Sequence, residues 1–120
     1  MSEFGLSKDE RLHSKRDIDT LMAKGRYGEF EFLKYKFLKT NGCPYNRIMV
    51  SVPKRFFKRA VKRNLLKRRI RESFRLQKHL IELNQEGEGT DILFIYSDRN
   101  VRTYSEIKEA TEKILTKING

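Results

Sequence analysis

Residues 54–78 read KRFFKRAVKRNLLKRRIRESFRLQK, and this stretch decides how the chain folds. Apolar side chains recur there every three or four positions, which predicts an amphipathic helix over about residues 58–81. Its apolar stripe consists of Leu66, Ile70, Phe74 and Ile81, with Ala60 nearby. We expect this stripe to pack against a sheet, because a helix with one apolar face must bury that face.

The same stretch carries all of the unbalanced charge. It contains twelve Lys and Arg and a single acid, Glu72. The 120-residue chain has 27 basic and 16 acidic residues, so the other 95 residues hold fifteen of each and are neutral. The formal net charge of +11 therefore lies within 25 residues. Such concentration indicates a surface that binds a polyanion, and Arg is well suited to phosphate groups.

A helical wheel places the polar side chains in two groups. One flank, roughly perpendicular to the apolar stripe, carries Asn64, Lys67, Arg68, Arg71, Arg75 and Lys78. Arg59 and Arg63 project near the stripe at the start of the helix, where we expect them to reach over the sheet edge. Two alternatives are a solvated face, which usually mixes signs of charge, and a helix lying on anionic lipid, which needs an exposed apolar face.

The flanking segments predict two more helices and three strands. A short helix over 14–24 begins with a capping-box pattern and stops at Gly25. Strands are expected over 29–39, with a bulge or bend near 32–33, and over 47–52, the two forming a hairpin. The apolar run 90–96 predicts a central strand. A last helix begins at the capping box Thr103–Glu106 and runs to about residue 118.

This order of elements, α-β-β-α-β-α, predicts helices on a small mixed sheet. The length suits one domain over residues 1–120, and residues 1–9 are expected to be flexible. No apolar run has the roughly 18 residues that a membrane span needs, and no secretory signal is evident. The lone Cys43 suits a reducing compartment. We therefore expect a cytoplasmic location.

Catalytic residues are not evident in the sequence. His13 and His79 are isolated, and Asp17 and Asp19 lie about 200° apart on the expected helix, so the two carboxylates do not share a metal ion. Cys43 has no histidine partner in view. The chain is rich in groups that hold phosphates and poor in groups that perform chemistry.

Residues 51–74 resemble the signature of the protein subunit of bacterial ribonuclease P: a strand ending in Ser-Val, then two basic residues, then Ala-Val-x-Arg-Asn-Arg-x-Lys-Arg-x-x-Arg-x-x-Phe. The matching residues are Lys54, Arg55, Ala60, Val61, Arg63, Asn64, Lys67, Arg68, Arg71 and Phe74. The resemblance extends over about residues 9–118. It implies an α/β (α+β) two-layer sandwich, in which an extra short strand and a left-handed βαβ crossover occur.

By this resemblance, the chain is expected to be the accessory subunit of a ribonucleoprotein that removes the 5′ leader from precursor tRNA. The catalytic RNA hydrolyses the phosphodiester with Mg²⁺, and the protein needs no organic cofactor, membrane or protein partner. The expected RNA-binding residues are Lys54, Arg55, Arg59, Lys62, Arg63, Asn64, Lys67, Arg68, Arg71 and Arg75. A cleft between helix and sheet is expected to hold the single-stranded leader.

Candidates for the leader cleft are Ile18, Met22, Phe32 and Tyr35, and for the two aromatic residues core packing is the alternative. Two departures from the family pattern stand out. Leu65 replaces the second Arg of Arg-Asn-Arg, and Ile18 and Met22 replace Phe in the first helix. The alternative function is a non-enzymatic RNA-binding module, such as a ribosomal or assembly protein, which explains the charge but not the signature around Arg63.

Overall fold

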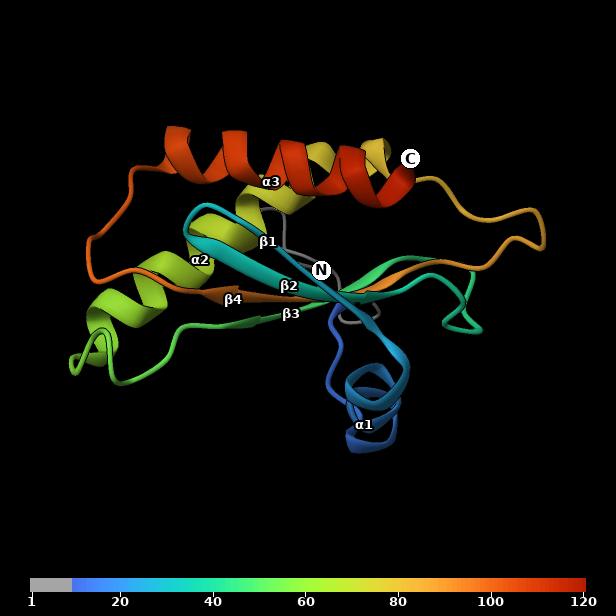
Figure 1. The fold of residues 1–120 in the computed structure, drawn as a ribbon, viewed down its shortest axis with the longest axis horizontal. Helices are drawn as coiled ribbons and strands as arrows, with labels where there is room; N and C mark the ends of the chain where they lie inside the picture. The colour runs from blue at the N-terminus through green and yellow to red at the C-terminus, as the bar shows by residue number, and fades with distance from the viewer. Residues whose placement is uncertain (1–9) are drawn as a thin grey trace.

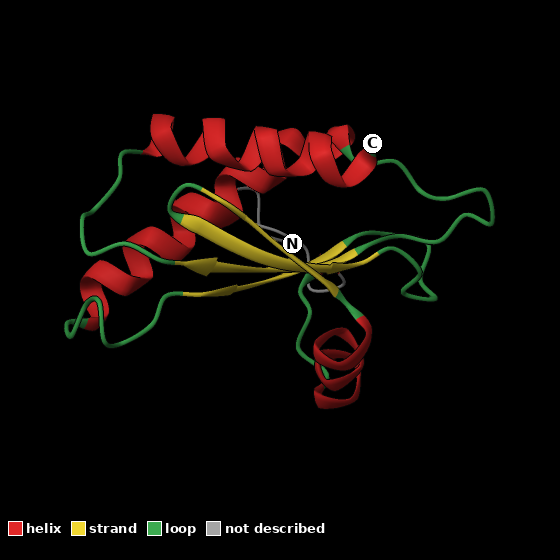
Figure 2. Cartoon of the chain, viewed as in Figure 1, coloured by secondary structure: helices red, strands yellow, loops and turns green. Residues whose placement is uncertain are grey.

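The computed structural model describes residues 10–120, which form three α-helices and a four-stranded sheet (Figures 1 and 2). The order is α1 (Lys15–Lys24), β1 (Arg26–Phe30), β2 (Leu33–Leu38), β3 (Arg47–Ser51), α2 (Ala60–Gln77), the 3₁₀ turn η2 (Lys78–Leu80), β4 (Asp91–Tyr96) and α3 (Tyr104–Asn119). The expectation of flexibility at residues 1–9 lies outside the described residues.

The segment predicted as one bent strand is a hairpin. β1 and β2 pair antiparallel, with Phe30 opposite Leu33, so Glu31 and Phe32 form the turn. Glu31 has φ 52°, in the left-handed region that a two-residue hairpin turn requires and that side chains other than Gly rarely adopt. The prediction of a bulge is therefore wrong, and the extra short strand implied by the family resemblance is present as β1.

The strand order is β1-β2-β4-β3. β4 pairs antiparallel with β2 and parallel with β3, so the predicted hairpin between residues 29–39 and 47–52 is wrong. β4 takes the place between them because it is apolar on both faces: Ile92 and Phe94 are fully buried and Leu93 nearly so. Helix α2 forms the crossover between the parallel strands β3 and β4. The left hand of this crossover stays a prediction.

The sheet separates two clusters of apolar side chains. The larger lies under α2 and α3 and includes Leu66, Ile70 and Phe74, all with no exposed surface, and Ile81 at 5%. This confirms the predicted stripe, except that Ala60 is exposed. The smaller cluster joins Leu21 of α1 to Leu93 of β4. Helix α1 thus covers the face of the sheet opposite α2 and α3 (Figure 1), which makes one face well covered and the other partly open.

Candidate nucleic-acid interface

Helix α2 is held on two sides, and this determines which of its side chains remain free. The apolar stripe of α2 packs against the sheet. A polar side of the same helix, which the sequence did not predict to be buried, packs against α3. There the buried Ser73 hydroxyl lies 2.9 Å from that of Thr111, and Gln77 Nε2 donates to the Lys108 carbonyl at 3.1 Å. The two remaining sides face solvent, so the basic side chains gather there.

Seven of the predicted basic residues make no hydrogen bond or ion pair through their side chains within the described part of the chain. Two of them are set apart, because Arg55 lies over the Phe56 ring and Arg71 is half-buried near Arg11. The other five are Lys54, Arg59, Lys62, Lys67 and Arg68. All but the half-buried Lys67 are exposed, and Asn64 is exposed beside them. The first turn of α2 contains no acid that would neutralise this end of the helix. This set is the free basic surface of the protein, defined here as Lys54, Arg59, Lys62, Asn64, Lys67 and Arg68.

Other cations of α2 and of the following turn η2 bond to groups of the protein itself. Arg75 pairs with Glu72 one turn earlier, and the pKa of Arg75 is raised by that carboxylate. Lys78 Nζ lies 2.7 Å from the Glu10 carboxylate. Arg69 donates to the carbonyl of Arg102 at 2.6 Å, which ties α2 to the start of α3. The free surface is therefore narrower than the flank drawn on the helical wheel.

Arg63 does not extend over the sheet edge as predicted. Its Nη1 donates to the carbonyl oxygens of Phe57 and Lys58, each at 2.7 Å. These carbonyls belong to the irregular segment between β3 and α2, so the guanidinium fixes the approach to the helix. Arg55, in the same segment, lies 4.9 Å over the ring of Phe56. Both guanidinium groups keep further N–H donors for an external anion.

The basic surface continues onto a residue outside the predicted helix. Arg11 forms an isolated parallel bridge with Ile48 at the β3 edge of the sheet. Burial lowers the pKa of Arg71, and the nearby charge of Arg11 lowers it further. Two like charges held near each other favour an anion between them. Arg11 lies within the residues over which the family resemblance extends, but the charge pattern of the sequence does not single it out.

The four candidates for the leader cleft do not come together. Phe32 and Tyr35 are 7% and 2% exposed in the core beneath α2 and α3, so their predicted role in contacting a leader is wrong and the core alternative is correct. Ile18 and Met22 lie on α1, against the opposite face of the sheet. Side chains alternate between the two faces along a strand, so Lys36, next to Tyr35 in β2, points to the face opposite Tyr35.

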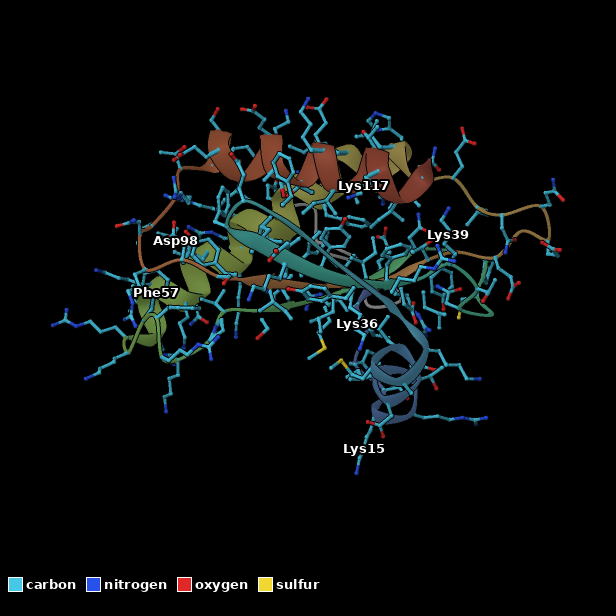
Figure 3. All side chains as sticks on the ribbon, in the orientation of Figure 1. Lys15, Lys36, Lys39, Phe57, Asp98 and Lys117 are labelled. Carbon is cyan, nitrogen blue, oxygen red and sulfur yellow. The ribbon has the colours of Figure 1, made fainter. Side chains whose placement is uncertain are left out.

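The partly open face of the sheet therefore carries two of the predicted side chains, Ile18 and Met22, together with others that were not predicted. Met22 is 48% exposed, and Ile18, Met49 and Ile95 are half-buried. Lys36 of β2 lies on the side of the sheet toward α1 (Figure 3), and its Nζ donates to the Met22 carbonyl at 2.6 Å. Alternation along β2 was the available signal, because Lys34 and Lys36 alternate with the buried Leu33 and Tyr35.

Among residues 10–120, no three His, Cys, Asp or Glu side chains are grouped so that they could hold a metal ion. His13 and His79 are both exposed; His13 precedes α1, and His79 lies in η2. Over the same residues, no helix has the length and apolar character to cross a bilayer. What the described surface offers is a set of cationic groups for anions.

The α/β sandwich with a basic helix left largely unneutralised defines a small nucleic-acid-binding protein. The family model described as Ribonuclease P matches residues 6–119. The chain belongs to this family of ribonuclease P proteins.

Individual relatives agree with this assignment. The chain is 35% identical to the ribonuclease P protein component of Porphyromonas gingivalis, over 98% of this chain and 88% of that protein. It is 34% identical to the ribonuclease P protein component of Borreliella afzelii, over 87% of this chain and 91% of that protein. The solved structure of the ribonuclease P protein from Thermotoga maritima superimposes with a TM-score of 0.76 at 29% identity, covering 92% of this chain and 99% of that one.

Proposed function

We propose that the protein binds the catalytic RNA of ribonuclease P and assists that RNA in removing the 5′ leader from precursor tRNA. One observation carries the proposal: the free basic surface lies on α2 and on the segment just before it, and the only acid of α2, Glu72, is already paired with Arg75. Repulsion among these cations is relieved when phosphates neutralise them, and counterion release then drives association. Family membership supplies the identity of the RNA.

The leader is assigned to the partly open face of the sheet beside α1. Met22 and Ile18 offer apolar contact to bases there, and Lys36 offers a cation to the backbone. Unstacked bases favour apolar and aromatic platforms flanked by positive charge. This face, between α1 and the sheet, is one form of the expected cleft between helix and sheet. The α2 side offers no such cleft, because the side chains of Leu66, Ile70 and Phe74 fill the interface between α2 and the sheet.

The chemistry is assigned to the RNA. In this proposal Mg²⁺ is bound mainly by the phosphates of the RNA partner, which are ligands that this ion prefers. The protein's own contribution is binding: the α2 surface holds the catalytic RNA, and the α1 face retains the leader.

Reconstitution tests the proposal. The protein is added to a bacterial ribonuclease P RNA at low Mg²⁺, and cleavage of a precursor tRNA is followed together with the affinity for its leader. Both should rise. Unchanged cleavage and unchanged leader affinity would contradict the proposal. A preparation of the protein without RNA serves as the control, and cleavage by it would place the chemistry in the protein.

A further inference from the structure

A second group of cations lies far from α2 in the sheet. A hollow of about 490 Å³ opens where α1, β1, β2 and α3 bring their ends together. It is lined by Lys24, Arg26, Phe37, Leu38, Lys39, Thr40, Lys117, Ile118 and Gly120. In Figure 3, Lys39 and Lys117 lie toward one end of the molecule, and Phe57, just before α2, lies at the other.

No acidic side chain lines the hollow. Four of the lining side chains are basic: Lys24, Arg26, Lys39 and Lys117. All four are exposed, and within residues 10–120 none makes an ion pair or side-chain hydrogen bond. Helix ends account for two of them, because Lys24 and Lys117 stand in the last turns of α1 and α3, where a cation is stabilising. Arg26 begins β1 and Lys39 follows β2, so the helix ends do not explain them.

Three of the other five lining residues are apolar, and Thr40 and Gly120 complete the lining. Phe37 and Leu38 are half-buried at the end of β2, and Ile118 is 1% exposed on α3. The volume falls within the roughly 300–1,000 Å³ of small-molecule sites in proteins. A cationic rim over an apolar floor matches a nucleotide, whose phosphate is anionic and whose base and sugar present flat, weakly polar surfaces.

This hollow is separate from the free basic surface. It lies at the β1–β2 side of the sheet, whereas α2 contacts β3, the strand at the opposite edge. Sequence analysis could not reveal it, because its cations come from residues 24, 26, 39 and 117. The fold concentrates charge here although the chain outside residues 54–78 is neutral in sum.

We infer that this hollow binds a nucleotide of single-stranded RNA, as a second contact in addition to the α2 surface. The cations at its rim hold the phosphate, and the half-buried Phe37 supports the base or sugar. The inference rests on the proposed function in one respect, which is that the polyanionic partner is RNA.

Nuclear magnetic resonance of the full chain tests this site separately from α2. A uridine tetranucleotide is titrated into the labelled protein, and backbone amide shifts are followed. Resonances of residues 24–26, 37–40 and 117–118 should move with one common affinity. The variant Lys39→Gln/Lys117→Gln should lower that affinity about tenfold near 0.15 M salt, since each lost phosphate contact removes about 0.7 from the salt exponent.

The matched control is Lys108→Gln/Lys113→Gln, which removes the same charge from exposed positions of α3 outside the hollow. It should keep the affinity at the hollow within twofold. Equal losses in both variants would show a general effect of net charge and overturn the inference, as would absent shifts at the hollow or an affinity unchanged in the first variant. The α2 resonances report on the proposed function: if they shift while the hollow does not, only the second site fails.

Discussion

Arg47 and Asp91 lie directly opposite each other in the parallel β3–β4 ladder and are joined by two hydrogen bonds. Arg47 Nε and Nη2 each donate to an Asp91 carboxylate oxygen at 2.8 Å, and Nη1 reaches Asp17 of α1 at 3.0 Å. Asp91 is only 2% exposed. One guanidinium thus connects the two parallel strands to the helix that borders the proposed leader face.

Replacing Asp91 with Ala should destabilise the fold by about 3–5 kcal/mol, because Arg47 would keep its charge in a mostly buried place without its main partner. Asn41 Nδ2, which donates to the same carboxylate at 2.9 Å, would lose one of its two acceptors and keep the Tyr45 carbonyl. Urea unfolding followed by circular dichroism measures the change. The control is Asp17→Ala, which should cost less than about 1 kcal/mol because this carboxylate is 36% exposed. Similar losses in both variants would refute the assignment.

Asp17 shows where sequence reasoning reached its limit. A capping box at Ser14 was expected from the local pattern, but Ser14 makes no side-chain cap and Asp17 bonds to Arg47 instead. The partner lies thirty residues away, and local spacing contains no information about it. The capping box at Thr103 is confirmed, because both of its hydrogen bonds are present. It was predictable because its two residues, Thr103 and Glu106, are three positions apart.

Arg68→Ala should weaken binding to ribonuclease P RNA without loss of stability. Arg68 is exposed and makes no hydrogen bond or ion pair within the described residues, so its removal subtracts one phosphate contact. The slope of log affinity against log salt should become shallower by roughly 0.7–0.9. Filter binding at four salt concentrations measures it, with Lys113→Gln as the control for charge. An unchanged slope would remove Arg68 from the interface.

Arg63→Ala should behave differently from Arg68→Ala. The guanidinium donates to two backbone carbonyls before α2, so its loss should lower the free energy of unfolding by about 1–2 kcal/mol as well as weaken RNA binding. Denaturant unfolding measures the first effect and the salt-dependent binding assay the second. The conservative variant Arg63→Lys tests the geometry, because an ammonium group does not reproduce the planar fork. Full stability in Arg63→Ala would contradict the structural role.

The fold was predictable where the pattern is local and periodic. The stripe Leu66, Ile70 and Phe74 followed from helical spacing, and the burial of the run 91–96 followed from its continuous apolar character. The hairpin turn was missed because Phe30-Glu31-Phe32 contains no Gly or Asn, the residues that usually adopt positive φ. Strand order was missed because β3 pairs with β4, which begins about forty residues after β3 ends. Proximity along the chain does not indicate such a pairing.

The same division applies to the site. Charge density located the basic helix, but intramolecular partners decided which cations are free. Some of these partners, such as Glu10 for Lys78, lie far away in sequence. Phe32 was chosen for its aromatic ring, although in the fold that ring lies 5.7 Å from Tyr96 and under Arg102. Residue type suggests what a side chain is able to bind, whereas burial decides whether a partner reaches it.

Met22→Phe should increase the affinity for a precursor tRNA leader at least fivefold. Met22 is 48% exposed beside the partly open sheet face, so a ring there adds stacking, worth roughly 1–3 kcal/mol per base, without disturbing the core. Affinities for precursor tRNA and for mature tRNA are compared in the reconstituted complex, and only the former should change. Met22→Leu is the matched control and should leave both unchanged. Equal affinities for the Phe and Leu variants would place the leader elsewhere.

Thr103→Ala should lower the free energy of unfolding by about 1 kcal/mol at pH 7, because Thr103 Oγ1 accepts the amide of Glu106 at the start of α3. In return, the Thr103 amide donates to the Glu106 carboxylate and lowers the pKa of that carboxyl group. A depressed folded-state pKa contributes stability above the unfolded value of about 4.3, and this contribution is lost as the pH falls through the folded pKa. Urea unfolding at pH 7 and pH 3.5 tests both statements.

The control is Thr116→Ala, at an exposed position of the same helix, which should change the free energy of unfolding by less than about 0.5 kcal/mol. A cost in Thr103→Ala no larger than that of Thr116→Ala would show that the capping box does not stabilise α3.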